Sequence, residues 1–352
     1  MILHLFPQEK FTVPFIKFIN TNFNMDDHLF IVYGENDSFK KNQIEDYNNI
    51  IYFNKDNIFK IIDYINKANK IIIHSFFIPK IIKIYIFIRS DILKRSGWVV
   101  WGADLYLHRI KGSNLKAKIS YYMNRKIIKN MGIIITLSKN DYNLAKKWYD
   151  VKGEYREGMY TNPLELGYLE NIKLNRVKAK NTVTIQIGNS ADKSNLHFEV
   201  IDLLKKYKDE NIKIFVPLSY GDNDYAAKVK EYGENIFNNK FVAILEFMDK
   251  KEYSDFLGSI DIAIFNNNRQ QALGNIRALL YLGSKVYMRD DTTMWCDFIS
   301  EGYIINNIKN IETEEFNEFI SNDINGINNN SKLAEDTFNE KIIAKKWQNI
   351  FK

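Results

Sequence analysis

A short polar segment, Gly188-Asn189-Ser190, directly follows an apolar run that ends at Ile187, and Ser194 comes shortly after it. A strand that ends in this way leaves backbone N–H groups without partners, and serine commonly caps the start of a helix. Free N–H groups and the positive end of a helix dipole both attract phosphate. The segment has neither a Walker loop nor a Gly-x-Gly-x-x-Gly fingerprint. Alone it indicates either a phosphate-binding turn or an ordinary turn.

A second polar cluster follows the apolar run Ile262–Phe265 and precedes an expected amphipathic helix. After three asparagines, its candidate ligand-binding residues are Arg269, Gln270, Gln271, Gly274 and Asn275. Amide groups can bond sugar hydroxyls, and a guanidinium can hold a diphosphate through two N–H groups at once. The three asparagines could equally form a polar loop in an asparagine-rich chain.

Asp104 offers a carboxylate that could act as a general base on a substrate hydroxyl. It follows the expected strand Trp98–Trp101 and is one of only two acids in a strongly basic stretch. The alternative role for such a residue is a turn or a helix cap. His74, in the expected strand Lys70–Phe76, would lie at the same sheet edge and is our second candidate for the base. A lone histidine in an apolar strand is more often a core residue.

These candidates need elements that place them at strand ends, and the chain alternates short apolar runs with amphipathic segments throughout. The expected strands are Ile2–Phe6, Leu29–Tyr33, Ile50–Phe53, Lys70–Phe76, Trp98–Trp101, Gly132–Thr136, Thr182–Ile187, Ile212–Val216, Phe241–Glu246, Asp261–Phe265 and Lys285–Met288. The expected helices are Phe11–Phe23, Asn57–Asn69, Pro79–Arg95, Lys116–Asn130, Lys139–Tyr149, Ser194–Tyr207, Asp224–Tyr232, Lys250–Leu257, Gln270–Leu282 and Thr292–Ser300. This alternation predicts an α/β fold with doubly wound parallel sheets, which bind ligands at the carboxyl ends of their strands.

The length of 352 residues fits two domains. We expect an N-terminal domain over residues 1–160, a linker over 161–180 that lacks periodicity, and a C-terminal domain over 181–332. A terminal helix within residues 333–352 is expected to pack back on the N-terminal domain.

Composition excludes several classes of protein. The chain is 45% hydrophobic and 14% aromatic, which is too apolar for a disordered chain. Its single cysteine, Cys296, cannot form an internal disulfide, which indicates a reducing compartment. The longest apolar stretch, 71–88, contains His74, Pro79 and two lysines, whereas a membrane-spanning helix needs about 20 predominantly apolar residues. The N-terminus is expected to form a strand and has no features of a signal peptide.

Positive charge is concentrated between Lys80 and Lys129. Twelve lysines and arginines against two acids give this stretch a net charge of +10, in a chain whose total is +6. Such a block favours an anionic partner, either a membrane surface or a nucleic acid. A solvated surface without a partner is the alternative.

Four motifs occur along the chain in a fixed order. They are Trp101-Gly-Ala-Asp-Leu-Tyr106, Gly188-Asn-Ser-x-Asp-x-Ser-Asn195 with His197, Val216-Pro217 followed by Tyr220, and Arg269-Gln-Gln-x-x-Gly274. In their order and spacing the chain resembles the family of the enterobacterial common antigen fucosaminyl transferase, TDP-Fuc4NAc:lipid II Fuc4NAc transferase (glycosyltransferase family 56). The resemblance covers nearly the whole chain, from Ile2 to the last helix.

The resemblance implies a GT-B fold, with two Rossmann-like domains facing across a cleft. The N-terminal domain would bind the acceptor and the C-terminal domain the sugar nucleotide. It also implies a cytoplasmic bacterial enzyme, peripheral on the inner face of the plasma membrane, that serves surface polysaccharide synthesis such as O-antigen or enterobacterial common antigen. The expected reaction moves a deoxyamino sugar (Fuc4NAc-like) from a TDP-sugar to a polyprenyl-diphosphate-linked glycan. The exact sugar is not fixed by the motifs.

The resemblance also suggests roles for residues. The expected nucleotide-sugar site comprises Gly188, Asn189, Ser190, Ser194, Tyr220, Glu246, Phe247, Met248, Arg269, Gln270, Gln271, Gly274 and Asn275. Within it, Phe247 would stack on the nucleobase. Asp104 would be the base if the mechanism inverts the anomeric centre, with His74 in reserve, and only an acceptor-positioning residue if the mechanism retains it. No acidic pair of the DxD type follows a strand among the C-terminal motifs, so we expect no metal and no other cofactor.

A lipid-linked acceptor keeps its tail in the bilayer, so the acceptor domain is expected to dock on an anionic membrane surface. We assign this contact to Lys116, Lys118, Arg125 and Lys126, because the segment Pro79–Arg95 is apolar enough to be largely core.

Two other readings compete with a glycosyltransferase. A sugar-nucleotide epimerase can have the same two-domain fold, but it has no need of a basic, aromatic surface. A nucleic-acid-binding protein would use that surface, but the chain shows no known nucleic-acid motif and its positive charge is confined to one domain. We therefore expect a nucleotide sugar, a lipid-linked glycan and a membrane as partners, and no nucleic acid.

Overall fold

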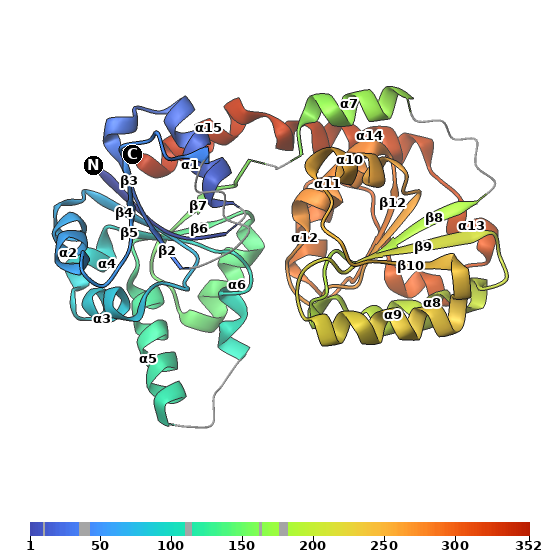
Figure 1. Cartoon of the computed structure of the whole chain (residues 1–352), viewed down its shortest axis with the longest axis horizontal. Coiled ribbons are helices and arrows are strands. Elements are labelled where there is room, and N and C mark those ends of the chain that lie inside the picture. The colour runs from blue at the N-terminus through green and yellow to red at the C-terminus, as the bar shows by residue number, and fades with distance from the viewer. Residues whose placement is uncertain (10, 35–42, 110–114, 162–163, 176–181) are drawn as a thin grey trace. The chain divides into compact units, whose positions relative to one another are not determined.

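The computed structural model of the chain describes residues 1–9, 11–34, 43–109, 115–161, 164–175 and 182–352. The chain divides into two compact units (Figure 1). The N-terminal unit comprises Met1–Thr161 together with Glu340–Lys352, and the C-terminal unit comprises Asn162–Asn339. Lys111, part of the basic stretch, lies outside the described residues, and so do parts of the expected linker.

The N-terminal unit is built on a seven-stranded sheet in the order β3-β2-β1-β4-β5-β6-β7. Every pair of neighbouring strands is parallel. Because the order reverses between β1 and β4, the sheet has a topological switch point there. The strands are β1 (Ile2–Pro7), β2 (His28–Tyr33), β3 (Ile50–Tyr52), β4 (Lys70–His74), β5 (Ser96–Val99), β6 (Ile133–Thr136) and β7 (Glu154–Glu157).

Alternation of side chains along these strands supplies two apolar faces. Leu3 and Leu5 of β1 join one buried cluster, and Phe6 joins the cluster on the other face. The first face is covered by α2 (Ile58–Lys67), α3 (Lys80–Ile88), α4 (Ser90–Lys94), α5 (Leu115–Asn130) and α6 (Lys139–Tyr149). The second is covered by α1 (Thr12–Asn22) and by α15 (Glu340–Phe351), the last helix of the chain.

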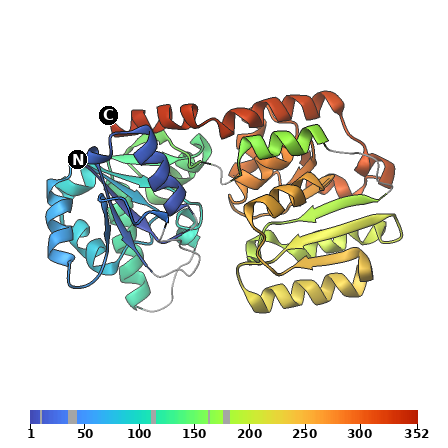
Figure 2. The same cartoon turned by 45° about the horizontal axis from the view of Figure 1, so that its top comes forward.

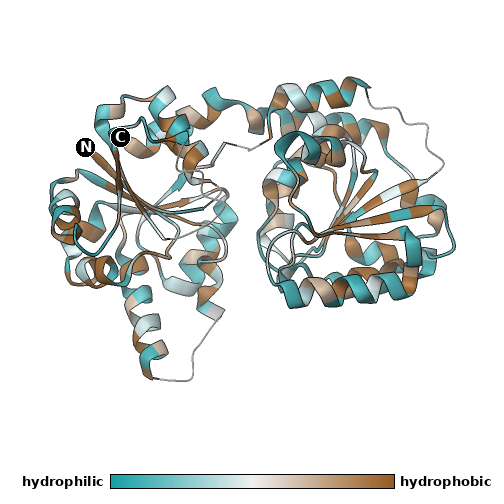
Figure 3. Ribbon diagram, in the orientation of Figure 1, coloured by the Kyte–Doolittle hydropathy of each residue, from teal (hydrophilic) through white to brown (hydrophobic). Residues whose placement is uncertain are grey.

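The C-terminal unit repeats this plan with a six-stranded sheet in the order β10-β9-β8-β11-β12-β13, again wholly parallel. Its switch point lies between β8 and β11. The strands are β8 (Val183–Ile187), β9 (Ile212–Pro217), β10 (Phe241–Ile244), β11 (Ile262–Phe265), β12 (Lys285–Met288) and β13 (Asn306–Asn307). Figure 2 shows β8, β9 and β10 side by side, and Figure 3 shows that these strands carry mainly hydrophobic residues.

Helices cover both faces of this second sheet. One face packs on α8 (His197–Leu204), α9 (Asn223–Phe237) and α13 (Phe316–Ile320). The other packs on α7 (Leu166–Asn175), α10 (Lys250–Gly258), α11 (Leu273–Leu282), α12 (Thr293–Ser300) and α14 (Ile324–Glu335). In Figure 1 α7, α10, α11 and α14 lie above the sheet and α8 and α9 below it.

Several expected elements differ from those observed. The middle of the expected linker is the helix α7, which packs on α10. Leu169 is the one fully buried residue of α7, with Leu166 and Ile172 partly buried, so its apolar pattern is short and weak. The expected helix Pro79–Arg95 is two helices, because the backbone at Arg89 leaves the helical region. The expected terminal helix is likewise divided, because α14 extends into this region and ends at Glu335, and α15 begins at Glu340.

Two strands, β7 and β13, do not appear in the sequence pattern at all. Both are edge strands of their sheets. The residues Glu154-Tyr-Arg-Glu157 and Asn306–Asn307 are polar and partly exposed, so neither strand has the apolar run that predicts a buried strand.

Candidate active site

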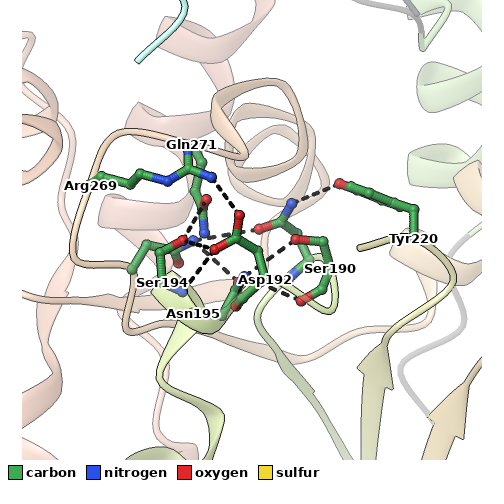
Figure 4. Close-up of polar contacts among 9 residues, drawn as sticks. Ser190, Asp192, Ser194, Asn195, Tyr220, Arg269 and Gln271 are labelled. Carbon is green, nitrogen blue, oxygen red and sulfur yellow. Dashed lines mark hydrogen bonds and ion pairs between the residues drawn. The ribbon is translucent and has the colours of Figure 1, made fainter. Parts of the chain in front are cut away.

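Two loops meet at the carboxyl edge of the C-terminal sheet, where its switch point lies. One follows β8 and the other follows β11, which are hydrogen-bonded neighbours although far apart in the sequence. The backbone joins the loops directly, because Asn268 donates its N–H to the Ser194 carbonyl over 2.9 Å. This is the position at which doubly wound sheets bind ligands. Figure 4 shows the polar side chains that gather there.

Gly188 allows the first loop to turn sharply after β8. Its φ is +62°, and a Cβ atom would lie 2.7 Å from Asn195 Oδ1 and 2.8 Å from His197 Nε2. Asn195 then closes the loop, because its Oδ1 accepts the Asn189 N–H over 3.2 Å and its Nδ2 donates to the Ser190 carbonyl over 3.2 Å. Any larger residue at position 188 would displace the side chains that hold the loop.

Ser194 does not cap a helix, contrary to our expectation. It lies in a single turn of 3₁₀-helix, Lys193–Asn195, and Asp192 caps that turn by accepting the Ser194 N–H over 2.8 Å. The α-helix α8 begins only at His197, because Leu196 before it adopts a left-handed conformation. Ser194 Oγ lies 2.6 Å from Asp192 Oδ1 and 3.0 Å from Gln271 Oε1, so it links the two loops instead.

Arg269 is held in place by Asp192, which the sequence analysis gave no role. Its Nη2 donates to Asp192 Oδ2 over 2.8 Å, and both side chains are partly buried. Burial acts to raise the pKa of Asp192, but hydrogen bonds from Ser194 and the charge of Arg269 keep it below its usual value. The pair is therefore ionised at neutral pH, and it fixes one guanidinium edge of Arg269 in the site.

Several buried polar atoms around the two loops have no hydrogen-bond partner within the described chain. They are Gln186 Oε1, His197 Nε2, Asn267 Oδ1, Gln270 Nε2 and Gln271 Nε2. Buried polar groups are nearly always paired, so such a concentration marks a place where a polar ligand or water completes the bonding. Burial also lowers the pKa of His197 to about 4, which keeps its imidazole neutral.

Tyr220, in the loop after β9, also belongs to this cluster. Asn189 Nδ2 donates to its hydroxyl over 2.9 Å, and the Tyr220 ring is 44% exposed. Gly274 and Asn275 lie in the first turn of α11. That helix begins after Ala272, which adopts a left-handed conformation and provides no side-chain cap.

Other expected site residues do not join this cluster. Glu246, Phe247 and Met248 follow β10 at the same sheet edge, but none of their described contacts reaches the two loops. The Phe247 ring is 83% exposed. Conversely, the motif that begins at Gly188 contains Asp192, Asn195 and His197, but we assigned these three residues no role from the sequence alone. Only their contacts show that they build the loop.

Asp104 does not fit the role of a general base. Its carboxylate is 0% exposed. It accepts the N–H groups of Phe76 (2.9 Å), Trp101 (2.9 Å) and Leu105 (3.0 Å), and the indole N–H of Trp98 (2.7 Å). Burial raises the pKa of Asp104 against the effect of these four donors. A carboxylate enclosed in this way ties the loops after β4 and β5 together, and each of its oxygens already accepts two N–H groups.

His74 is buried as well, and both of its ring nitrogens are engaged. Nδ1 lies 2.5 Å from the Tyr160 hydroxyl, and Nε2 lies 3.0 Å from Nδ1 of His4. It cannot contact a substrate directly, so a role as base would have to act through Tyr160.

Among the described residues, no group of three or more His, Cys, Asp or Glu side chains could hold a metal ion. Within the same residues, no helix is long and apolar enough to cross a membrane.

Solved structures share the fold over nearly the whole chain. A glycosyltransferase from Rickettsia africae ESF-5 has a TM-score of 0.69 at 14% identity, covering 99% of this chain and 97% of its own. Anabaena HepE, in complex with UDP and glucose, has a TM-score of 0.67 at 11% identity and covers 100% and 99%. Sucrose-phosphate synthase from Thermosynechococcus elongatus has a TM-score of 0.62 at 10% identity and covers 100% and 98%. The two Rossmann-like units therefore form a GT-B fold, as the sequence predicted.

The sequence itself defines the family. A family profile described as "4-alpha-L-fucosyltransferase glycosyl transferase group 56" matches residues 12–329. The chain belongs to glycosyltransferase family 56, which confirms the resemblance, and it is a glycosyltransferase.

The role of Asp104 can be tested by substituting asparagine, which cannot accept hydrogen bonds through its Nδ2. At least two of the four buried N–H donors would lose their partner, at about 1–3 kcal/mol each. We expect Asp104→Asn to lower the free energy of unfolding by roughly 2–5 kcal/mol in denaturant titrations. The matched control is Asp91→Asn, which changes the exposed acid of the same basic stretch. A variant as stable as the wild type but inactive would instead support Asp104 as the base.

Proposed function

We propose that this glycosyltransferase moves a deoxyamino sugar of the Fuc4NAc type from a TDP-sugar to a polyprenyl-diphosphate-linked glycan. The donor would bind at the two loops after β8 and β11. The observation that carries this assignment is the set of buried, unpartnered polar atoms around Gly188, beside an Arg269 that Asp192 holds in place. Neutral amides suit sugar hydroxyls, and a fixed guanidinium suits a diphosphate.

In this reaction the bond between the sugar C1 and the diphosphate oxygen breaks, and the diphosphate leaves with the electron pair. Arg269 is placed to stabilise that developing charge, and the positive end of the α11 helix dipole adds to it. Gln270 and Gln271 supply amide groups to the sugar. These positive groups are the basis for proposing that the reaction needs no metal ion.

Two exposed rings are available for the nucleobase. Tyr220 is already tied to the Gly188 loop through Asn189. Phe247, with Glu246 and Met248 beside it, is largely exposed after β10. An aromatic ring that is exposed in the free enzyme can stack on a thymine without first losing packing contacts.

A membrane-bound acceptor would require the N-terminal unit to dock on the bilayer. The helices α3 and α5 pack together, and α5 extends beyond the body of the unit (Figure 1). We define the docking surface as their exposed apolar residues, Ile81, Ile84, Ile88, Leu115, Ile119 and Tyr122, with Lys116 and Lys118 among them. The expectation that α3 is largely core is thus wrong for one of its faces.

The two other basic residues assigned to this contact are partly engaged elsewhere. Arg125 is half-buried and its Nη1 donates to the Trp148 carbonyl over 3.0 Å, so it stabilises the packing of α5 on α6. Lys126 lies over the Phe87 ring at 4.5 Å. We therefore propose Lys116 and Lys118, with their apolar neighbours, as the main contact with an anionic leaflet on the inner face of the plasma membrane.

The proposed reaction is tested by incubating the enzyme with a TDP-deoxyamino sugar and a short-chain polyprenyl-diphosphate glycan, and detecting the extended glycan by mass spectrometry.

Arg269→Gln should weaken TDP binding about 10- to 100-fold in calorimetry, because it removes a charge-assisted contact worth about 1.5–3 kcal/mol. The matched control is Lys230→Gln, a partly exposed cation paired with Glu234 on α9. Unchanged TDP affinity in folded Arg269→Gln would move the donor site elsewhere. Isomerised TDP-sugar in the absence of acceptor would favour an epimerase.

The docking surface is tested with Lys116→Glu/Lys118→Glu and, separately, with Ile84→Ser/Ile119→Ser. Each lysine near an anionic leaflet contributes about 1 kcal/mol. Both variants should therefore float less with anionic liposomes and transfer more slowly to a long-chain acceptor, while transfer to a soluble short-chain acceptor persists. The control Lys146→Glu/Lys147→Glu makes the same charge change on α6. Flotation lost equally in this control would show that net charge, and not this surface, binds the membrane.

A further inference from the structure

A continuous chain of hydrogen-bonding side chains runs through the N-terminal unit. The Trp101 indole N–H donates to the Tyr160 hydroxyl over 2.9 Å, and that hydroxyl lies 2.5 Å from His74 Nδ1. His74 Nε2 lies 3.0 Å from His4 Nδ1, and His4 Nε2 lies 3.0 Å from His28 Nδ1. Three of the five histidines of the protein are thus joined ring to ring.

The chain extends from one edge of the sheet to the other. Tyr160 comes after β7 and Trp101 after β5, so both lie at the carboxyl edge, where a parallel sheet binds its ligands. His74 is the last residue of β4, whereas His28 is the first residue of β2 and lies at the amino edge. Tyr160 as a residue is partly buried, with its hydroxyl between the Trp101 indole N–H and His74 Nδ1, and His28 is buried, with 4% of its surface exposed.

Aromatic rings enclose the imidazoles. Phe6 stacks on His74 at 4.0 Å and Phe30 stacks on His4 at 4.5 Å. Burial lowers the pKa of His4 and His74 well below 6.5 and that of His28 to about 4. The charged groups that act on His28 are Asp27, which raises its pKa, and the N-terminal amine, which lowers it. All three rings are therefore neutral at pH 7.

A neutral imidazole has one N–H and one lone pair. Three such rings in a row, with Tyr160 donating to the first, must all carry their proton on Nε2. If one proton moves along each bond, all three rings instead carry it on Nδ1 without any side chain changing place. This is the arrangement of a proton relay.

We propose that Tyr160 receives the proton of the acceptor hydroxyl and that His74, His4 and His28 carry it to the opposite edge of the sheet. The inference rests on the proposed function and applies to a displacement that inverts the anomeric centre. The acceptor oxygen bonds to C1 as the diphosphate leaves with its electron pair. The acceptor proton moves to Tyr160, the tyrosine proton to His74 Nδ1, and one proton along each following bond. His28 then releases its Nε2 proton to water, so atoms and charge balance.

The relay gives the proton of the acceptor hydroxyl a route that Asp104 and His74 cannot provide directly. Asp104 is enclosed by four donors, and His74 has both ring nitrogens engaged, so neither can meet a substrate hydroxyl. Burial raises the pKa of Tyr160 well above 10, which opposes a free tyrosinate. Tyr160 can therefore accept a proton only while it passes its own to His74, and the histidines make that possible.

The relay is tested on the whole enzyme with the short-chain acceptor. Tyr160→Phe should lower kcat about 100-fold or more, as expected when a general base is lost, and His28→Ala about tenfold, with KM for both substrates unchanged. Added imidazole should restore His28→Ala. The matched control is Phe351→Ala, which removes the ring that packs on His28 at 4.7 Å but leaves the relay complete. It should keep kcat within about threefold of wild type.

A second measurement does not depend on activity. Nitrogen-15 spectra of histidine-labelled protein at pH 7 should show one and the same neutral tautomer at His4, His28 and His74. A charged imidazole, or different tautomers at neighbouring rings, would overturn the relay whatever the activity. A kcat unchanged by His28→Ala, or no rescue by imidazole, would also overturn it. A wild-type enzyme that binds TDP but transfers no sugar would instead overturn the proposed reaction, and with it the role of the relay.

Discussion

The turn at Gly188 is the constraint on which the proposed donor site depends. A Cβ atom at this position would meet Asn195 Oδ1 and His197 Nε2 at less than 3 Å, and Asn195 is the side chain that closes the loop. The closed loop sets the position of Asp192, which in turn fixes Arg269 across the switch point. One missing side chain at the end of β8 therefore determines where a cation lies at the end of β11.

The central strands, and the sheet edge at which the candidate site lies, could be predicted because parallel sheets obey simple rules. The apolar runs fix the central strands, and the carboxyl ends of β8 and β11 must lie together once the sheet is doubly wound. This rule together with the family resemblance therefore brought Gly188, Asn189 and Arg269 into one expected site, although they lie far apart in the sequence. The edge strands β7 and β13 and the helix α7 could not, because partly exposed elements have no strong apolar pattern.

The role of Asp104 shows a different limit. A carboxylate after a strand in a basic stretch has the same sequence signature whether it is a base or a structural anchor. The number of N–H groups around the carboxylate decides between these two roles. At Asp104 these groups come from two different strand ends and belong to Phe76, Trp98, Trp101 and Leu105. No spacing rule along the chain predicts that convergence.

The two units use buried polar groups in opposite ways. Around Gly188, amide and imidazole atoms are buried without partners, which costs stability unless a ligand completes their bonding. Around Asp104 and the three histidines, the carboxylate oxygens and most ring nitrogens are paired within the protein, although Tyr33 Oη and Ser75 Oγ nearby are not. A framework whose carboxylate and ring nitrogens are already paired would position the proposed acceptor with few direct contacts. In the proposed relay, the proton that leaves the acceptor travels through bonds that this framework already contains.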